Sequence, residues 1–487
     1  MKKIFAFIMI IGLMAIALCG TAYAEETGPV VLSVSGLIDD KIVELSHWTN
    51  FAEGWEKAVT LATDDDYMDD NGFVRIIVDL KADWEANDKG EFGKSSWKGF
   101  QYTTIYVPDD ARITINMNGH TIDRGLTEWE WNGEVICIGD DADVIINNGT
   151  IKGGFSGNGA GGIHIYDGAD VTLNDVTLCN NRVDDDYGMA IGLFGGATLT
   201  MNGGSISDNL SYVTTPGAYG GGVYINDAKA TFKGVTFENN QGVNFSTYGA
   251  AVFVDDGTLV MEECKVIGNG LVGKNGDETY AGAYSIIDAL TGSNVTIKNT
   301  TFSSNGYAQE ALVAHNTLRY TTVIRAVASF LTMEETCDFS DNNQVFLLTS
   351  EAAILTVRDT DFTGNDSFAF FGQCASSFGS TFTECKFSYN EPMLNLSSTF
   401  KFLLNNVNIT FVDCDFGDAT FSNRNAATFV DSNANPKDPA SIFGEGSLSM
   451  VVALIALIVS VASILVNRSY KKGLIPSTTG DEKNEKE

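Results

Sequence analysis

Hydrophobic and polar residues alternate with a period of two over most of the chain, in short segments that return at a regular interval. In Val171-Thr172-Leu173, and again in Val176-Thr177-Leu178, apolar residues flank a threonine, and Asn181 follows three residues later. A period of two is typical of strands that bury one face, whereas helices show a period of 3.6. These segments are therefore predicted to be short β-strands.

The same two-strand unit recurs nine times with a nearly constant register. The last apolar residue of the first strand lies five residues before the apolar residue of the second, except from Met333 to Phe339, where the step is six. All copies but the last end on an asparagine, at intervals averaging about 30 residues, and such a period is typical of solenoids. Asparagine tolerates left-handed turns, and stacked amides can bond from coil to coil, so these residues are interpreted as a structural ladder rather than as ligands or glycosylation sites. The ladder comprises Asn181, Asn209, Asn240, Asn269, Asn305, Asn342, Asn365 and Asn390.

A third strand in each repeat is predicted from Gly- and Ala-rich segments that run into apolar residues, such as Gly161–Ile165, Gly220–Ile225 and Gly249–Val254. Three short strands per turn predict a parallel β-helix whose coils stack about 4.8 Å apart. The predicted fold is all-β, with β-helix repeats over residues 112–432 that make about ten or eleven coils.

Residues 25–111 lack the repeat pattern of residues 112–432 and are predicted to form an N-terminal cap and the first strands. Asn50 and Glu53 form a capping-box pair ahead of an apolar stripe at four-residue spacing, which predicts an amphipathic helix. An open solenoid end exposes strand edges and apolar core, so we expect this helix to cover the end.

Both ends of the chain are predicted to be targeting and membrane-anchoring segments rather than parts of the folded domain. Residues 1–24 combine two lysines, an apolar run and a small-x-small ending, as a cleaved signal peptide does. Residues 448–466 are uncharged and, at about 1.5 Å per residue, long enough to cross a bilayer as one helix. Basic residues follow at once, which predicts a cytoplasmic tail at 467–487 and an ectodomain outside the cell, with 433–447 as spacer.

The net charge of the chain argues against some classes of partner. Residues 25–447 contain 23 basic and 59 acidic residues, a formal charge of −36. Such acidity argues against nucleic acid as a partner, and the 44% of apolar residues argues against a disordered acidic protein.

The repeats resemble right-handed, pectate-lyase-like β-helix proteins and, in detail, the polymorphic outer-membrane-protein adhesins. The copy most similar to the adhesin repeat motifs is Gly220-Gly221-Gly222-Val223 with Phe237-Glu238-Asn239-Asn240, and the resemblance covers some 300 residues. Those adhesins carry a different membrane anchor, so a bacterium with a single membrane is the expected host. The resemblance implies right-handed coils and surface adhesion far more than an activity.

Enzymes that share this fold cleave acidic polysaccharides with aspartate clusters, calcium and a basic residue. The resemblance therefore also implies a catalytic alternative of this kind. In this chain the outward row of the third strand shows no carboxylate pair for acid–base work, so no catalytic residue is predicted. It contains Cys137, His164, Gly192, Tyr224 and Phe253. No resident cofactor is expected, although an aspartate row at successive turns could bind calcium weakly. This row comprises Asp140, Asp167, Asp227 and Asp255.

Four tyrosines precede the Gly- or Ala-rich strands of consecutive coils and follow the connections of most variable length. Aromatic side chains suit both sugars and protein hot spots, although packing over a neighbouring turn is the commoner fate. The candidate binding residues are Tyr187, Tyr219, Tyr248 and Tyr280.

Seven cysteines remain after signal removal, and four of them precede the second-strand apolar residue, where they should point into the core. A disulfide between Cys385 and Cys414, one coil apart, is geometrically allowed.

These observations predict a non-enzymatic, membrane-anchored, adhesin-like surface protein. Its expected partner is a glycan or a protein of a host or neighbouring cell, bound through loops on one side of the β-helix. A polysaccharide lyase or glycoside hydrolase, and a structural stalk, remain the alternatives.

Overall fold

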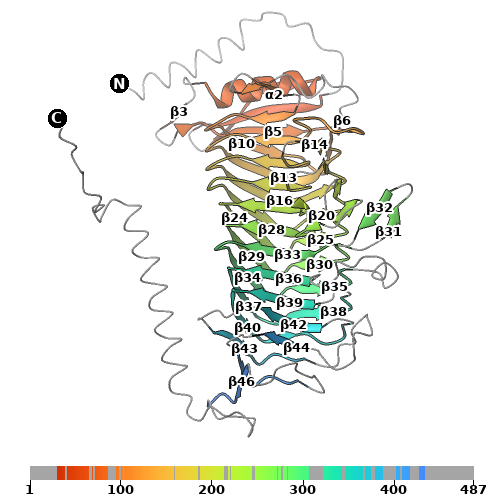
Figure 1. The fold of residues 1–487 in the computed structure, drawn as a ribbon. Helices are drawn as coiled ribbons and strands as arrows, with labels where there is room; N and C mark the ends of the chain where they lie inside the picture. Colours follow the sequence, from red (N-terminus) through yellow and green to blue (C-terminus); the bar gives the residue numbers. More distant parts are fainter. Residues whose placement is uncertain are drawn as a thin grey trace, which may run out of the picture.

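The computed structural model describes a long stack of short strands that runs from an N-terminal helix toward residue 433 (Figure 1). The described residues are 30–38, 41–64, 68–69, 72–85, 95–97, 100–102, 104–157, 159–184, 187–212, 218–219, 221–243, 247–270, 273–275, 278–281, 283–306, 322–342, 346–365, 368–373, 379–387, 402–405, 409–416 and 427–433. The predicted signal peptide, membrane helix, cytoplasmic tail and Asn390 lie outside these residues. Within them, no helix has the length and apolarity needed to cross a bilayer.

One face of the stack is an 11-stranded sheet in which every pairing is parallel. Its strands, one from each successive turn of chain, are β9 (Ile105–Val107), β12 (Ile136–Ile138), β15 (Ile163–Ile165), β18 (Ile191–Leu193), β23 (Val223–Asn226), β28 (Val252–Asp255), β33 (Ser285–Leu290), β36 (Thr322–Val327), β39 (Phe346–Glu351), β42 (Phe368–Gln373) and β44 (Phe402–Asn405).

The remaining faces are built mainly by a 23-stranded sheet, parallel except where β1 pairs with β2 and β5. It contains β1 (Leu32–Ile38), β2 (Lys41–Trp48), β5 (Ile76–Leu80), β6 (Trp84–Glu85), β10 (Arg112–Asn116), β11 (Thr121–Asp123), β13 (Asp143–Lys152), β16 (Asp170–Cys179), β19 (Thr198–Asn202), β20 (Ser205–Ser207), β24 (Lys229–Lys233), β25 (Thr236–Glu238), β29 (Thr258–Glu262), β30 (Lys265–Ile267), β34 (Asn294–Lys298), β35 (Thr301–Ser303), β37 (Phe330–Glu334), β38 (Cys337–Ser340), β40 (Ile354–Arg358), β41 (Thr360–Asp361), β43 (Ser380–Thr383), β45 (Ile409–Val412) and β46 (Ala427–Val430).

Smaller sheets lie in the connections. A six-stranded sheet contains β14 (Phe155–Ser156), β17 (Arg182–Asp184), β21 (Leu210–Tyr212), β26 (Gln241–Val243), β31 (Gly273–Asn275) and β32 (Glu278–Ala281). The two-stranded sheets are β22 (Ala218–Tyr219) with β27 (Thr247–Tyr248), β3 (Met68–Asp69) with β4 (Gly72–Phe73), and β7 (Ser95–Trp97) with β8 (Phe100–Tyr102). The parallel sheets confirm the predicted parallel β-helix, and parallel pairing begins ahead of residue 112, at β5 and β9.

The core consists of columns of identical or similar apolar residues, one from each coil. The alternation buries the predicted residues and leaves the intervening threonines half-exposed, as in the pattern of β16. Phe302, Phe339, Phe362, Phe387 and Phe416 stack in sequence with ring centroids 4.6, 4.9, 5.0 and 5.4 Å apart. At the one six-residue step, from Met333 to Phe339, two consecutive non-glycine residues have positive φ, Glu335 and Thr336.

The asparagines form a continuous buried ladder. Asn240 shows the pattern: its Nδ2 donates to the Asn269 Oδ1 and to the Ile206 carbonyl, each at 2.9 Å. Its own Oδ1 accepts from the backbone N–H and the Nδ2 of Asn209, at 3.3 and 2.9 Å. The same bonds connect Asn181, Asn209, Asn240, Asn269, Asn305, Asn342 and Asn365, all 2% exposed or less.

The predicted helix is α2 (Phe51–Ala62), whose N-cap Asn50 accepts from the backbone N–H of Glu53 at 3.1 Å. It lies at one end of the stack in Figure 1. Trp55 and Leu61 are buried against the first coils, and the Trp55 Nε1 donates to the carbonyl of Tyr106 at 3.2 Å.

Cys385 and Cys414 occupy equivalent positions in adjacent coils, because Phe382 pairs with Phe411 and Lys386 with Asp415. Each Sγ atom lies near the carbonyl two residues before it, at 3.4 and 3.5 Å respectively. None of the six described cysteines forms a disulfide bond in the structure, and threonines occupy this position in the coils that separate Cys264, Cys337 and Cys385.

Oxidised glutathione is expected to join Cys385 to Cys414 by thiol–disulfide exchange and to leave Cys264 and Cys337 reduced. Adjacent coils bring α-carbons within disulfide range, whereas two coils do not. Peptide mapping without reductant would show this linkage and the loss of two hydrogens. A Cys337–Cys385 linkage, or two alkylatable thiols at 385 and 414 after treatment, would contradict the stated register.

Candidate functional site

The outward row of the 11-stranded sheet, one side chain from the middle of each strand, is the first feature of the candidate site. Strand register gives its members in order as Tyr106, Cys137, His164, Gly192, Tyr224, Phe253, Asp288, Arg325 and Thr349. The five residues from Cys137 to Phe253 therefore do share one row. Past these five, the row continues with two charged residues, Asp288 and Arg325.

A column of tyrosines lies beside this row. Tyr187 and Tyr219 stack with ring centroids 6.5 Å apart, Tyr219 and Tyr248 with 5.8 Å, and Tyr248 and Tyr284 with 4.8 Å. We refer to Tyr187, Tyr219, Tyr248 and Tyr284 as the tyrosine column.

Tyr284 takes the fourth place that the sequence analysis gave to Tyr280. Tyr280 lies in β32, whose backbone pairs antiparallel with β26 and β31, so a hairpin here lengthens the connection before the next strand. The register-matched core residues are Ile191, Val223, Val252 and Ile287. Tyr187, Tyr219 and Tyr248 precede theirs by four residues, Tyr284 by three and Tyr280 by seven, a spacing that could have identified Tyr284.

The tyrosine column packs over the aromatic part of the outward row. The ring of Tyr187 lies 4.6 Å from that of Tyr224, and the ring of Tyr219 lies 4.8 Å from that of Phe253. Tyr224 and Phe253 are consequently only 7% and 2% exposed, whereas Tyr187 and Tyr219 are 38% and 42% exposed. Because the column rings stack on one another, the faces that they turn toward each other are covered.

His164 continues the aromatic surface toward the N-terminal coils. Its ring stacks on Tyr166 at 4.4 Å and on Phe194 at 4.9 Å. Burial lowers the pKa of His164 to about 4, so the imidazole is neutral at physiological pH. It acts here as an aromatic packing residue.

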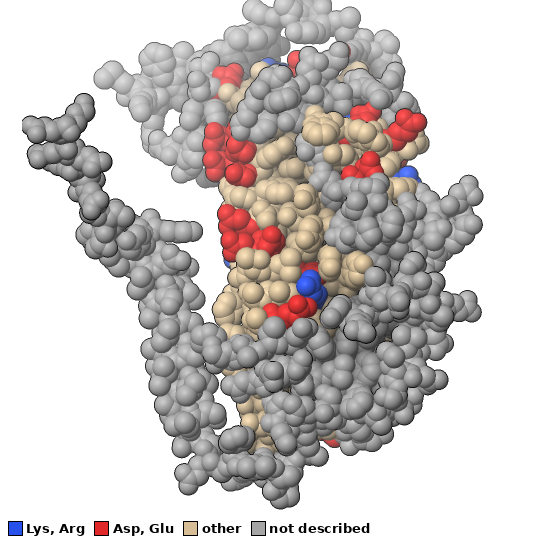
Figure 2. Space-filling view, viewed as in Figure 1, with Lys and Arg blue, Asp and Glu red and all other residues tan. Residues whose placement is uncertain are grey.

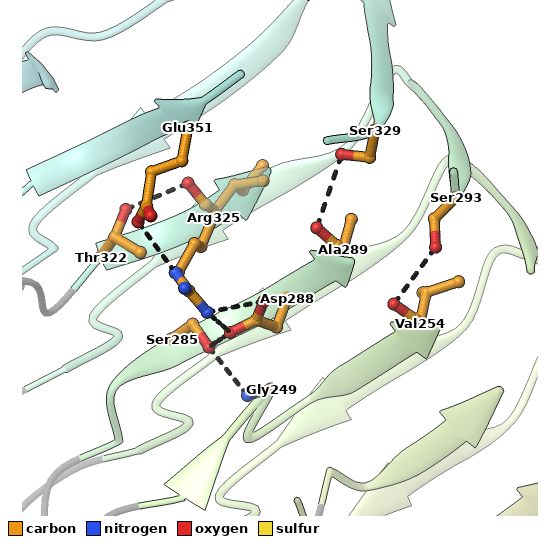
Figure 3. Close-up of polar contacts among 11 residues, drawn as sticks. Gly249, Val254, Ser285, Asp288, Ala289, Ser293, Thr322, Arg325, Ser329 and Glu351 are labelled. Carbon is orange, nitrogen blue, oxygen red and sulfur yellow. Dashed lines mark hydrogen bonds and ion pairs between the residues drawn. The ribbon is translucent and has the colours of Figure 1, made fainter. Parts of the chain in front are cut away.

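At the other end of the aromatic surface lies a compact polar cluster (Figure 3). The Arg325 guanidinium donates from Nε to Glu351 at 3.2 Å and from Nη1 to Asp288 at 3.3 Å. The Ser285 hydroxyl donates to Asp288 at 2.6 Å, and Arg325 lies 5.3 Å from the ring centroid of Tyr248. We refer to Asp288, Arg325, Glu351 and Ser285 as the ion-pair cluster.

Burial dominates the electrostatics of this cluster. The Asp288 side chain is fully buried, and this burial raises its pKa to about 6 although Arg325 and Ser285 pull in the opposite direction. Arg325 and Glu351 remain 19% and 28% exposed at their side chains. The sequence analysis missed the cluster because its members are distributed over three coils.

The candidate calcium aspartates do not form one row. Asp141 donates its backbone N–H to the Asp167 carbonyl, and Asp227 donates likewise to Asp255, which makes Asp227 equivalent to Asp141 rather than to Asp140. Gly195 and Asn226 interrupt the remaining series. Figure 2 shows several groups of acidic side chains on the described surface and few basic ones. Among described residues, no three His, Cys, Asp or Glu side chains are arranged to hold a metal ion.

Comparison with known proteins agrees with the observed parallel β-helix. Residues 104–302 match the family described as right handed beta helix region. Neither the curated proteins nor the solved structures include a match to this chain. The family match gives the hand of the coils and leaves the activity open.

Proposed function

From a right-handed parallel β-helix with an acidic surface, we propose that this chain is a non-enzymatic, adhesin-like binding protein of the cell surface. The predicted signal peptide and C-terminal membrane helix would hold it there, with the repeats outside. Its ligand-contacting side is the tyrosine column and the connections that precede it.

The observation that carries this proposal is the exposure of Tyr187 and Tyr219 within an ordered stack. Large aromatic side chains fixed by their neighbours give contact area without much loss of conformational entropy, as in binding hot spots. Their hydroxyls suit hydrogen bonding to a glycan or a protein backbone. A formal charge of −36 over residues 25–447 disfavours a polyanionic ligand.

Replacing Tyr187 and Tyr219 together with Ala is expected to weaken ligand binding at least tenfold, with a smaller loss for the two Tyr→Phe changes. Truncation removes the contact area, whereas Phe keeps the ring and loses one hydroxyl. A glycan array with and without calcium, followed by calorimetric titration, measures the effect. Phe330→Ala is the matched control, because Phe330 is 46% exposed outside this column. Equal affinities of the double variant and the wild type would refute the assignment.

The ion-pair cluster favours one other function, cleavage of a polysaccharide. A carboxyl group with a pKa of about 6 beside a second carboxylate and an arginine is the chemistry of an acid–base pair. The full burial of Asp288 argues against it, because a general acid must reach its substrate. Product release that disappears in Asp288→Asn would establish this alternative.

A further inference from the structure

Two tryptophans in the segment between β11 and β12 lie away from the features used so far. Trp129 is 52% exposed and Trp131 is 63% exposed, the largest values for any large apolar side chain among the described residues. Exposing two tryptophans costs hydrophobic free energy that burial would recover, so neighbouring exposed tryptophans commonly mark a binding surface.

The backbone between the two tryptophans is held in place. The Glu130 N–H donates to the Phe155 carbonyl at 3.0 Å, and the Gly157 N–H donates to the Glu130 carbonyl at 2.8 Å. Glu130 thereby extends the edge of the six-stranded sheet beside Ser156. A fixed backbone at this point means that the tryptophans are presented in one arrangement.

The Glu130 side chain is fixed as well. Its carboxylate lies 3.4 Å from the Nη2 of Arg124, and that arginine is 4% exposed and also donates to the Glu134 carbonyl. Both the backbone and the side chain of the residue between the two tryptophans are therefore held in place.

The indole ring of Trp129 packs against the backbone of Gly157. A Cβ atom at position 157 would lie 2.7 Å from the Cε3 atom of Trp129, so only glycine lets the indole rest on the backbone there. Trp129 nevertheless remains 52% exposed, so a large part of its indole meets solvent. This differs from the tyrosine column, whose faces are covered by other rings.

We propose that Trp129 and Trp131 form a stacking platform for the pyranose rings of a neutral polysaccharide. The inference rests on the proposed binding function and specifies its ligand class. Sugar rings present apolar C–H faces to an aromatic ring, and an accessible indole face is the surface that they need.

The charged side chains beside the two tryptophans favour one class of polysaccharide over the others. Glu128, which is exposed, is the neighbouring hydrogen-bond acceptor for sugar hydroxyls, whereas the Glu130 carboxylate is paired with Arg124. The carboxylate of Glu128 repels uronate- or sulfate-bearing polymers, while Arg124 is buried and paired with Glu130. A neutral polyhydroxylated chain satisfies both conditions.

The test uses the full-length protein in detergent, titrated with soluble β-glucan and xylan as neutral probes and with polygalacturonate as an acidic probe. Tryptophan fluorescence and calorimetry report binding. We expect a neutral probe to bind, polygalacturonate to bind at least tenfold more weakly, and Trp129→Ala/Trp131→Ala to lose at least tenfold in affinity for the neutral probe. Phe replacements at both positions should retain most of the affinity, and Phe330→Ala should retain all of it.

Different failures separate the two proposals. If the tyrosine variants lose ligand while the tryptophan variants bind as wild type, the platform is refuted and the binding function stands. Preferred binding of polygalacturonate would also refute the platform. If no glycan binds but a protein partner does through the tyrosine column, the platform is again refuted. Thermal melts of each variant, matched to wild type, exclude unfolding as the cause of a loss.

Discussion

Replacing Asn240 with Ala is expected to lower the free energy of unfolding by about 3–5 kcal/mol. Asn240 is fully buried in the middle of the ladder, and its amide serves neighbours on both sides. Alanine would leave the Ile206 carbonyl and the Asn209 side-chain and backbone donors without these partners. A buried polar group without a partner costs about 1–3 kcal/mol, and more than one is created here.

A second asparagine column supplies the matched control. Asn174 donates to Asn147 at 2.8 Å and accepts from Asn202 at 2.9 Å, but it lies partly exposed on the outside of the 23-stranded sheet. Water can replace its bonds, so Asn174→Ala should cost about 1 kcal/mol or less. Urea denaturation of both variants measures the difference. Equal losses would contradict a special role for the buried ladder.

Replacing Arg325 with Met is expected to destabilise the protein by about 3–5 kcal/mol at pH 8, because it leaves the Asp288 carboxylate buried without its counter-charge. The loss should shrink at pH 5, where Asp288 takes up a proton. Its folded-state pKa of about 6 lies above its ordinary value of 3.8. This group's contribution to stability is therefore fully present below pH 3.8 and is lost as the pH rises through 6.

Removing the Arg325 guanidinium raises the Asp288 pKa further. The pH range over which the Asp288 contribution to stability is lost then extends upward, so the stability of the variant depends more on pH than that of the wild type. Asp288→Asn removes the titration of Asp288, so the loss of stability that Arg325→Met adds in the Asp288→Asn background should be nearly the same at both pH values. Chemical denaturation of all four proteins at pH 5 and pH 8 completes the cycle. An Arg325→Met loss that is the same at both pH values would show that the ion pair does not control this region.

The strands and the ladder were predictable because every coil imposes the same demand. The five-residue step from Phe232 to Phe237 repeats because each coil must place an apolar side chain at the same point of the core. Asn240 follows because its buried amide bonds to Asn209 and Asn269 in the neighbouring coils. Position in the repeat therefore encodes position in space.

The candidate site was predictable only where the repeat is regular. The β31–β32 hairpin lengthens one connection, so the spacing that identified Tyr219 and Tyr248 led to Tyr280 instead of Tyr284. Asp288 and Arg325 are 37 residues apart and meet only through strand register, which no local motif reports. Trp129 and Trp131 flank Glu130, which pairs with Ser156 at the edge of the six-stranded sheet, and the two-strand repeat recognised in the sequence does not include that sheet.

The central claim, binding without turnover, is tested most directly by incubating the purified protein with neutral and acidic polysaccharides, with calcium and with chelator. Bound ligand and released sugar ends are measured in the same samples. The account predicts retention of ligand on the protein with no new reducing or unsaturated ends under either condition. Release of oligosaccharide products, abolished by Asp288→Asn, would contradict it and identify the ion-pair cluster as a catalytic centre.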